Sequence, residues 1–211
     1  MTAIKNDFKY VIGIDEVGRG PIAGPVAVCA LAIRRDRLIG RKGKYAMARF
    51  ENFKDSKKLS HNQRVRWLSK INLEKAKGNI TYKVSFESNK VIDAKGIVFA
   101  INKCLKDSLK FINKSKKESL VLLDGGLAAP AEYENQETII KGDEKELAIA
   151  LASIVAKEAR DDFMIRLAGR YQGYGLEKHK GYGTKQHYKA LKNKGVSPIH
   201  RNSFLKRFRG A

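Results

Sequence analysis

The sequence is poor in cysteine and contains no long apolar run. Its two cysteines, Cys29 and Cys104, lie in apolar stretches, so we expect buried thiols in a reducing compartment rather than a disulfide framework. The absence of clustered Cys and His residues argues against a structural zinc site. No apolar stretch is long enough to span a bilayer, and residues 1–8 lack the apolar core of a signal peptide. Together these absences predict a cytoplasmic protein.

Acidic residues are scarce relative to basic ones. The 211 residues include 43 Lys and Arg but 22 Asp and Glu, which gives a formal net charge of +21. Such an excess suits a polyanionic partner, because neutralised phosphates release their counterions on binding. A basic protein without catalytic activity, such as one associated with the ribosome, would show the same excess. The length is sufficient for one domain with a sizeable core and a small extension.

The scarcity of acids is complete near the C-terminus, where residues 178–211 contain no Asp or Glu. Basic residues are interleaved with aromatic ones over this stretch. The pattern predicts that residues 171–211 form a basic helical extension, which packs on a catalytic domain of residues 1–170 and lies along nucleic acid. A solvated basic tail is the alternative. His179 and His187 belong to this stretch and are interpreted as surface residues or phosphate contacts.

Apolar runs alternate with helical patterns along the chain, which predicts an α/β domain with a mixed central sheet flanked by helices. We expect strands at 9–15, 26–33, 80–86, 119–123 and 138–140, and helices at 61–77, 89–112 and 144–170. Ser60 and Gln63 form a capping-box pattern before the first helix, and Gly96 should bend the second. A long surface loop is expected within 34–53 and a hairpin at 127–137.

Three of the expected strands end in carboxylates: Asp15-Glu16 closes the first, and Asp124 and Asp143 follow two later ones. Ligands of open α/β sheets gather where loops leave the carboxyl ends of strands, so these four acids are expected to meet. Adjacent carboxylates at a buried strand end are costly, and a divalent cation offsets that cost. An all-oxygen set selects Mg²⁺ or Mn²⁺, and in a basic protein it predicts phosphodiester cleavage with two metal ions.

Each acid taken alone has an ordinary structural interpretation. Asp143 is a good N-cap for the following helix, with Glu146 completing a capping box. Asp124 before Gly125-Gly126 is equally consistent with a turn, and a bare Asp-Glu pair usually ends a strand in a polar turn. The constellation favours metal binding more strongly than any single member does.

Gly18-Arg19-Gly20 follows the first pair of acids after a single residue, Val17. Glycine allows the backbone to come close to a ligand, and the planar guanidinium of Arg19 suits a phosphate. A nucleotide-binding loop is not favoured, since no Gly-Lys-Ser/Thr follows and the next element is expected to be a strand. The segment therefore predicts a phosphate contact beside the metal site.

Several blocks of the sequence resemble ribonuclease HII, a type 2 ribonuclease H, in the order found in that family. They are GIDEVGRGPIAGPV at 13–26, DSKKL at 55–59, VLLDG at 121–125, KGD at 141–143, ASIVAK at 152–157 with RD at 160–161, HKGYGT at 179–184, and HRNSF at 200–204. The resemblance covers nearly the whole chain, and its first block is highly specific. It implies an RNase H-like fold and endonucleolytic cleavage of RNA in RNA–DNA hybrids.

The same resemblance implies incision on the 5′ side of a single ribonucleotide in duplex DNA, with 3′-hydroxyl and 5′-phosphate products. The corresponding roles are the removal of ribonucleotides from DNA and of RNA primers. Carried over residue by residue, the catalytic acids and metal ligands are Asp15, Glu16, Asp124 and Asp143, with Asp15 bridging two ions.

The resemblance also implies substrate contacts. Gly18-Arg19-Gly20 would read the 2′-hydroxyl and the adjoining phosphate, and Tyr182 would pack on the sugar that follows the ribonucleotide. Lys57 is a candidate phosphate contact. Lys157 and Arg160 are weaker candidates, because either could instead support the acids or the fold.

Two rival interpretations are disfavoured. Ribonuclease HIII carries an additional N-terminal domain and a glutamate as its fourth acid, whereas here few residues precede the first motif and the fourth acid is Asp143. A non-catalytic nucleic-acid-binding protein would explain the charge but not four acids at strand ends. Residues 202–208 loosely resemble a sliding-clamp peptide with Leu205 and Phe208 as anchors, although the usual second aromatic is absent. We expect a monomer that acts on RNA–DNA hybrids and on duplex DNA containing ribonucleotides.

Overall fold

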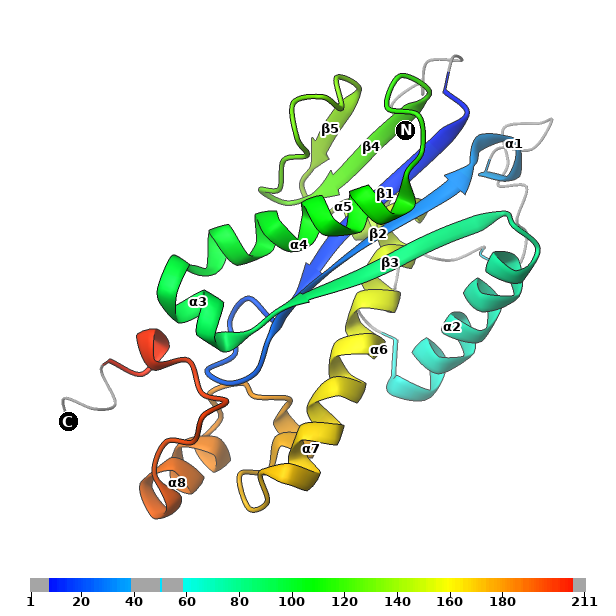
Figure 1. Ribbon diagram of the computed structural model, residues 1–211. Helices are drawn as coiled ribbons and strands as arrows, with labels where there is room; N and C mark the ends of the chain where they lie inside the picture. The colour runs from blue at the N-terminus through cyan, green and yellow to red at the C-terminus, as the bar shows by residue number, and fades with distance from the viewer. Residues whose placement is uncertain (1–7, 39–49, 51–58, 207–211) are drawn as a thin grey trace.

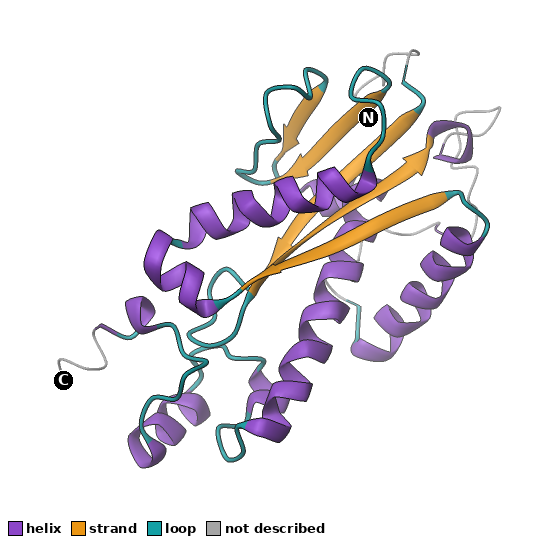
Figure 2. Ribbon diagram, viewed as in Figure 1, coloured by secondary structure: helices purple, strands orange, loops and turns teal. Residues whose placement is uncertain are grey.

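The computed structural model describes residues 8–38, 50 and 59–206. The five strands form one sheet in the order β3-β2-β1-β4-β5, and helices cover both of its faces (Figures 1 and 2). The strands are β1 Tyr10–Val17, β2 Val26–Arg34, β3 Ile80–Glu87, β4 Ser119–Asp124 and β5 Gln136–Ile139. The β1–β2 and β2–β3 pairs are antiparallel, whereas β1–β4 and β4–β5 are parallel. The mixed sheet expected from the sequence is confirmed.

The described helices are α1 Arg35–Leu38, α2 His61–Ala76, α3 Asn89–Lys95, α4 Ile97–Ile112, α5 Gly142–Lys145, α6 Leu147–Arg170, α7 Leu176–His179, α8 Lys185–Lys194 and the short 3-10 helix η3 Asn202–Phe204. Four of them form the two layers around this sheet. α3 and α4 cover one face of the sheet, and α2 and α6 cover the other (Figure 1). Among the described residues, no helix is both long and apolar enough to cross a membrane.

The central strand β1 alternates between two buried cores, as the two-residue period of a strand requires. Val11 packs with residues of α2 and α6, whereas Ile12 and Ile14 pack with residues of α4. Between them, a Cβ atom on Gly13 would lie 2.1 Å from the carbonyl carbon of Ala148. The absent side chain therefore lets α6 cross β1 closely, and this contact brings α6 to the strand end that carries the acids.

The C-terminal segment packs on the end of α6 and on the loop between β1 and β2. Its apolar contacts form a third cluster, which contains Ile22, Ala23, Met164, Tyr174, Leu176, Leu191, Ile199 and Leu205. Backbone hydrogen bonds tie the same parts together: Ile22 N–H donates to Gly181 O at 2.9 Å, and Arg201 N–H donates to Ile22 O at 2.8 Å. The helical content of this segment agrees with the sequence, while its separation from residues 1–170 as a substrate-binding extension stays a prediction.

Two local expectations hold and one long helix is divided. The capping box of Ser60 and Gln63 is present at the start of α2, and Gly96 separates α3 from α4. The helix expected over 144–170 is interrupted because Glu146 is extended, with φ −121° and ψ 120°, between α5 and α6. Of the expected loop over 34–53, α1 and Phe50 fall within the described residues.

The cap interpretation of Asp143 is wrong. α5 begins after Lys141, which has a left-handed backbone (φ 56°), and Asp143 lies inside this short helix. The N-cap of α6 is Glu146, and it makes no side-chain capping bond. The backbone turns twice within a few residues here, so Asp143 is not at a helix start and Glu146 is an N-cap residue rather than the third residue of the helix.

The hairpin expected at 127–137 is also absent, because β4 and β5 are parallel. The connection folds back on itself through the side chain of Gln136. This amide accepts from Ala129 N–H at 2.8 Å and donates to Tyr133 O at 3.0 Å. The compact loop returns the chain to the start of the sheet edge, so β5 runs in the same direction as β4.

Candidate active site

A pocket of about 280 Å³ lies at the carboxyl ends of β1 and β4. These strands are parallel neighbours, so the ends that carry Asp15-Glu16 and Asp124 meet at one edge of the sheet. The pocket is lined by Asp15, Glu16, Val17, Arg64, Asp124, Ser153, Ile154 and Lys157. Two larger hollows, of about 410 and 440 Å³, each contain a single carboxylate among basic residues. The gathering of acids, rather than size, therefore distinguishes this pocket.

The carboxylates in the pocket oppose one another's ionisation. Asp15 is 7% exposed. Burial, with repulsion from Glu16 and Asp124 added to it, raises the pKa of Asp15 to about 7, although a hydrogen bond from Ser153 opposes the shift. Burial also raises the pKa of Glu16, where Arg19 opposes the shift and Asp124 adds to it. A bound cation would offset both the burial and the repulsion.

Asp124 links the end of β4 to α5. Gly142 N–H donates a 2.7 Å hydrogen bond to Asp124 Oδ1. A Cβ atom on Gly142 would meet Ile149 at 2.5 Å, so this position has no room for a side chain. Asp143 follows and is fully buried, but it does not line the pocket. The structure thus brings three of the four predicted acids to one pocket and places the fourth in the helix that is bonded to Asp124.

The residues present fit a hard divalent cation in their chemistry. The donors that line the pocket are carboxylate oxygens and the Ser153 hydroxyl, with no His or Cys among them. In the described part of the chain, no three His, Cys, Asp or Glu side chains stand close enough together to enclose an ion. The pocket therefore offers the ligand types that Mg²⁺ and Mn²⁺ prefer without a preformed cage.

The Gly18-Arg19-Gly20 loop leaves the pocket directly after β1. Gly18 is buried with φ +88°, a backbone conformation that favours glycine. The Arg19 side chain is 56% exposed and lies 3.5 Å from Glu16. A Cβ atom on Gly20 would be 3.9 Å from the ring of Tyr182, which is itself 41% exposed. The structure thus places Tyr182 beside the loop, as a joint role in substrate binding requires.

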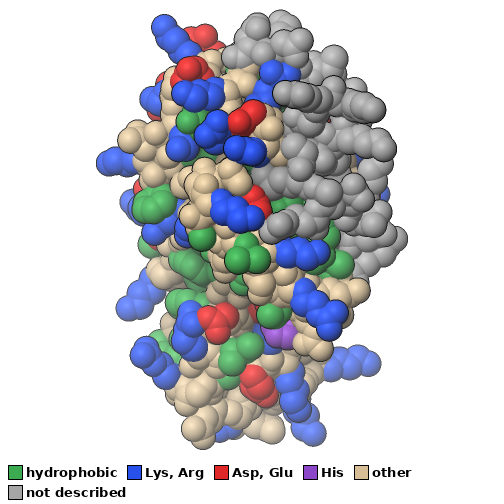
Figure 3. Space-filling model, turned by 90° about the vertical axis from the view of Figure 1, so that its right-hand side faces the viewer, with side chains coloured by type: hydrophobic (Ala, Val, Ile, Leu, Met, Phe, Trp, Pro, Cys, Tyr) green, Lys and Arg blue, Asp and Glu red, His purple; other side chains and the backbone are tan. Residues whose placement is uncertain are grey.

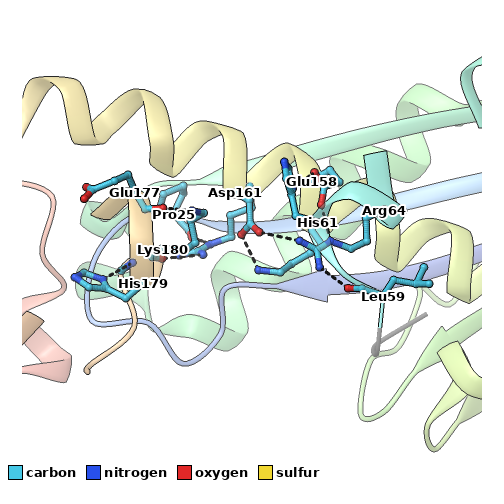
Figure 4. A network of polar contacts seen from close by, with 12 residues as sticks. Pro25, Leu59, His61, Arg64, Glu158, Asp161, Glu177, His179 and Lys180 are labelled. Carbon is cyan, nitrogen blue, oxygen red and sulfur yellow. Dashed lines mark hydrogen bonds and ion pairs between the residues drawn. The ribbon is translucent and has the colours of Figure 1, made fainter. Parts of the chain in front are cut away.

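Arg64 and Lys157 line the acid pocket as its cations, and Arg64 was not singled out from the sequence. Arg64 Nε lies 2.5 Å from Glu158, its Nη1 donates to Leu59 O at 2.9 Å, and its Nη2 is 3.6 Å from Asp161. Lys157 Nζ lies 2.7 Å from the same Asp161 (Figure 4). The local sequence signal for Arg64 is its place in the first turns of α2, after the DSKKL block, because both of its acidic partners lie on α6.

The remaining candidate residues do not share one location in the structure. Arg160 lies beneath the Gly18 loop and is fully buried. It donates to backbone carbonyls, among them those of Pro25 and Lys180, which are labelled in Figure 4. It therefore supports the loop from inside and does not contact solvent. Ser153 belongs to a block that resembles the family, yet its place in the pocket was not anticipated. Lys57 lies outside the described residues.

His187 and His200 of the C-terminal segment are buried and His179 is half-buried, so the interpretation as a surface residue or phosphate contact is wrong for His187. His187 is 0% exposed and His200 is 1% exposed. Ser197 N–H donates to His200 Nδ1 at 3.0 Å, the two Nε2 atoms are 3.0 Å apart, and His187 Nδ1 lies 2.9 Å from Tyr182 O. The sequence pattern of a basic, aromatic-rich stretch carried no signal for this burial.

A neutral form of both rings satisfies this hydrogen-bond chain. His200 Nδ1 accepts from Ser197 N–H, His200 Nε2–H donates to His187 Nε2, and His187 Nδ1–H donates to Tyr182 O. Burial lowers the pKa of His187 to about 4 and lowers that of His200 as well. The hydrogen-bond chain ends on the backbone oxygen of Tyr182, and the ring of the same residue lies beside Gly20.

Comparison with known proteins agrees with this architecture. The sequence model of the family described as Ribonuclease HII matches residues 12–207. A ribonuclease HII of Clostridium beijerinckii is 43% identical over 198 residues, which cover 94% of this chain and 68% of the relative. Another, from Caldicellulosiruptor bescii, is 38% identical over 203 residues, which cover 96% of this chain and 90% of the relative.

Solved structures share the fold. The RNase HII in the PCNA:RNase HII complex of Archaeoglobus fulgidus is 26% identical, with a TM-score of 0.66 over 91% of this chain and 93% of that chain. Bst-RNase HIII in complex with Mn²⁺ is 19% identical, with a TM-score of 0.62 over 90% of this chain and 64% of that chain. The expected RNase H-like fold is confirmed. The chain belongs to the ribonuclease HII family and is a ribonuclease H that acts on RNA–DNA substrates.

Proposed function

We propose that this ribonuclease H cuts the RNA strand of RNA–DNA hybrids and also incises duplex DNA on the 5′ side of a single ribonucleotide. The observation that carries the proposal is the pocket itself, in which carboxylates from β1 and β4 lie beside the Gly18-Arg19-Gly20 loop. Cleavage is hydrolytic and leaves 3′-hydroxyl and 5′-phosphate ends. In the cell, this activity would remove ribonucleotides from DNA and RNA primers from replicated strands.

The acids hold two divalent ions, Mg²⁺ or Mn²⁺, when substrate is bound. Asp15, Glu16 and Asp124 supply oxygens from the pocket wall, and Asp143 joins them from α5. The charges of Glu16 and Asp124 both act on Asp15, so this carboxylate would gain most from a bound cation. Ions held there would supply an activated water and would stabilise the charge on the leaving oxygen.

The side chains around the acids orient the nucleic-acid backbone. Arg64 and Lys157 line the same pocket, and each is held in place by carboxylates of α6. Their positive charges stabilise the phosphate that enters the pocket. Ser153, which donates toward Asp15, keeps that carboxylate turned into the pocket.

Ribose recognition falls to the loop and to Tyr182. Gly20 has no side chain, so a sugar can approach its backbone, and the Tyr182 ring stands beside it with an exposed face. The loop reads the 2′-hydroxyl, which is the group that distinguishes RNA from DNA, and Tyr182 packs on the next sugar. Residues 171–211 then extend this contact along the duplex, and the protein acts as a monomer.

The packing of Leu205 argues against its expected role as an anchor for a sliding clamp. This side chain is 1% exposed and belongs to the apolar cluster between α6 and α8. It therefore cannot serve as a clamp anchor in this conformation, and Phe208 lies outside the described residues. Binding of a clamp to the full chain and to a chain that ends at Leu205 would decide whether the last six residues suffice.

A cleavage assay with Mg²⁺ or Mn²⁺ tests the proposal. Its substrates are duplex DNA with one ribonucleotide, an RNA–DNA hybrid and an all-DNA duplex. A single cut 5′ to the ribonucleotide, abolished by EDTA and absent from all-DNA, is expected. Cleavage of the hybrid alone would agree with the catalytic role of the acids, but it would contradict the proposed role of the loop and Tyr182 in recognising the ribose. Light scattering on the same sample reports whether the protein is monomeric.

Binding of uncleaved hybrid in EDTA should depend strongly on salt. Lys and Arg side chains are scattered over the coloured part of the face seen in Figure 3 and outnumber the acidic ones there. Affinity should fall roughly 100-fold or more between about 50 and 200 mM salt, since each neutralised phosphate releases a counterion. An affinity that does not change with salt would contradict the electrostatic role of the basic surface.

A further inference from the structure

Two buried arginines lie beneath the loop that joins β1 to β2. Arg160 comes from α6 and Arg201 from the segment before η3, and both are 0% exposed. Arg201 binds the start of the loop and its far side: Nη2 donates to Gly18 O at 2.7 Å, Nη1 to Arg19 O at 3.0 Å and Nε to Gly24 O at 3.0 Å. One guanidinium therefore holds three carbonyl oxygens of this loop.

Arg160 completes the arrangement from the other side. Its Nε donates to Pro25 O at 2.9 Å, its Nη2 to Ala23 O at 3.4 Å and its Nη1 to Lys180 O at 3.1 Å. A Cβ atom on Gly18 would lie 2.2 Å from Arg160 Nε, and one on Gly24 would lie 2.4 Å from the sulfur of Met164. The glycines are therefore required by the groups packed beneath the loop as well as by its turn.

The bonds to Arg201 determine which way the loop's N–H groups point. In a trans peptide, the carbonyl of one residue and the N–H of the next point in opposite directions. Since Gly18 O and Arg19 O both turn inward to Arg201, the N–H groups of Arg19 and Gly20 turn away from it. Neither N–H donates a hydrogen bond to another described residue. Two successive N–H groups that point outward form a cradle for an oxygen-rich ligand.

Burying two like charges is unfavourable for folding alone. Burial, followed by the nearby charge of Arg160, lowers the pKa of Arg201 to about 9, so the guanidinium stays charged at neutral pH. Neither arginine takes part in an ion pair within the described chain. Carbonyl oxygens accept their hydrogen bonds, while the negative charges of Asp161 and Asp93 favour the charged forms of Arg160 and Arg201 without an ion pair. The two guanidinium groups therefore place positive charge behind the outward N–H groups.

The position of Arg201 is itself set by α3. Asp93 accepts hydrogen bonds from the backbone N–H groups of Asn202 and Ser203, at 2.8 and 2.9 Å. The Arg201 guanidinium also lies 5.1 Å from the ring centre of Phe204. The segment is therefore fixed on three sides, and little freedom remains for the guanidinium to move away from the loop.

We propose that Arg201 is a positioning residue for ribose recognition: it never touches the substrate, but it turns the Arg19 and Gly20 N–H groups outward to meet the ribonucleotide. The inference rests on the proposed function, in which this loop reads the 2′-hydroxyl. Arg160 binds other carbonyls, so the orientation of these two peptides depends on Arg201. Loss of this orientation should impair selection of a single ribonucleotide more than cleavage of a continuous hybrid, where every neighbouring nucleotide carries a 2′-hydroxyl.

The test compares Arg201→Lys with Arg170→Lys, a control at an exposed position near the end of α6. Lysine keeps the charge but has a single ammonium, which cannot span three carbonyl oxygens. Amide exchange of the peptide that contains residues 18–24 should become about tenfold faster or more in Arg201→Lys. Its kcat/KM on duplex with one ribonucleotide should fall about tenfold further than on hybrid. Arg170→Lys should match the unsubstituted protein in both measurements.

Unchanged exchange in a folded Arg201→Lys protein would overturn the inference. So would faster exchange with an equal loss on both substrates, because Arg201 would then be structural only. If Arg201→Lys does not fold, Phe204→Leu takes its place with the same two readouts. This substitution removes the ring beside the guanidinium. An unsubstituted protein that cuts hybrid but not single-ribonucleotide duplex would contradict the proposed function, and the exchange measurement would still decide whether Arg201 orients the loop.

Discussion

The carboxylate pocket at the ends of β1 and β4 and the arginine-held loop at 18–25 are neighbours along the chain, but their charges are balanced in different ways. In the pocket, buried carboxylates repel one another, and the nearby cations are engaged by other acids of α6. In the loop, two buried guanidinium groups are satisfied by backbone carbonyl oxygens. A bound cation would therefore stabilise the pocket, whereas the charges of the loop are compensated within the chain.

This difference separates two tasks of one site. A pocket that is strained by its own charge gains most from binding metal ions, so its geometry and stability should depend on them. A loop that is fixed from inside keeps its N–H groups in place before substrate arrives, which reduces the ordering cost of recognition. Substitution of a pocket acid should therefore reduce activity without reducing stability, whereas a substitution that disturbs the packing beneath the loop should reduce stability.

The largest effect on activity should follow Asp15→Asn. Cleavage of hybrid should fall about 10³-fold or more, on the order of 4 kcal/mol of transition-state stabilisation. Without divalent ions the free energy of unfolding should not decrease, because the substitution removes a buried charge that is repelled by Glu16 and Asp124. Urea unfolding in EDTA and a cleavage assay measure the two quantities.

The control for this substitution is Asp107→Asn, at a half-exposed position on α4. Adding Mg²⁺ or Mn²⁺ should raise the melting temperature of the unsubstituted protein and of Asp107→Asn, but not that of Asp15→Asn. Equal stabilisation of all three proteins by the ion would show that the pocket is not where it binds.

The largest effect on stability should come from the loop, through Gly18→Ala. A side chain here meets the buried Arg160 at 2.2 Å in a backbone with φ +88°. Arg160 can make room only by giving up bonds to carbonyl oxygens, so the free energy of unfolding should fall by about 3 kcal/mol or more. Gly78→Ala is the matched control, since Gly78 has φ +73° with nothing within 4 Å, and should cost about 1 kcal/mol. Similar losses in urea unfolding would contradict the packing of Arg160 on Gly18.

The same contrast explains what the sequence could predict. The strands, the Ser60 capping box and three pocket acids follow from local periodicity and from where apolar runs end, and they lie where expected. The positions of Arg160 and Arg201 depend on bonds between residues 135 and 183 positions apart. Composition suggested that Arg, Lys and His of the C-terminal segment are exposed, because burial of a charge requires partners that only the folded chain brings together.

A smaller effect should appear when the pH is lowered. The unfolded imidazole pKa is near 6.5, while burial lowers that of His187 to about 4, so the unfolded state takes up a proton first as the pH falls. Above pH 6.5 the imidazole is neutral in both states, and the free energy of unfolding is not reduced. Between pH 6.5 and 4 the unfolded state alone binds the proton, so the free energy of unfolding falls. His187 alone should cost about 2 kcal/mol at pH 5. Urea unfolding of Asp15→Asn at pH 7.5 and 5 measures this loss, because the raised pKa of Asp15 adds stability over the same pH range in the unsubstituted protein. An NMR titration of the folded protein in which His187 has a midpoint near 6.5 would contradict the neutral His187–His200 pair.

The smallest effect should follow Tyr182→Ala. The ring is 41% exposed, and the bond from His187 goes to the backbone oxygen of Tyr182, which alanine keeps. Stability should therefore change by less than ~0.5 kcal/mol. Cleavage at a single ribonucleotide should fall about fivefold, or ~1 kcal/mol, because a sugar loses its aromatic contact beside Gly20. Phe111→Ala, which removes an aromatic ring that is 58% exposed on α4, should leave cleavage unchanged. A large loss of stability in Tyr182→Ala would instead place the ring with the buried histidines, as part of the support beneath the loop.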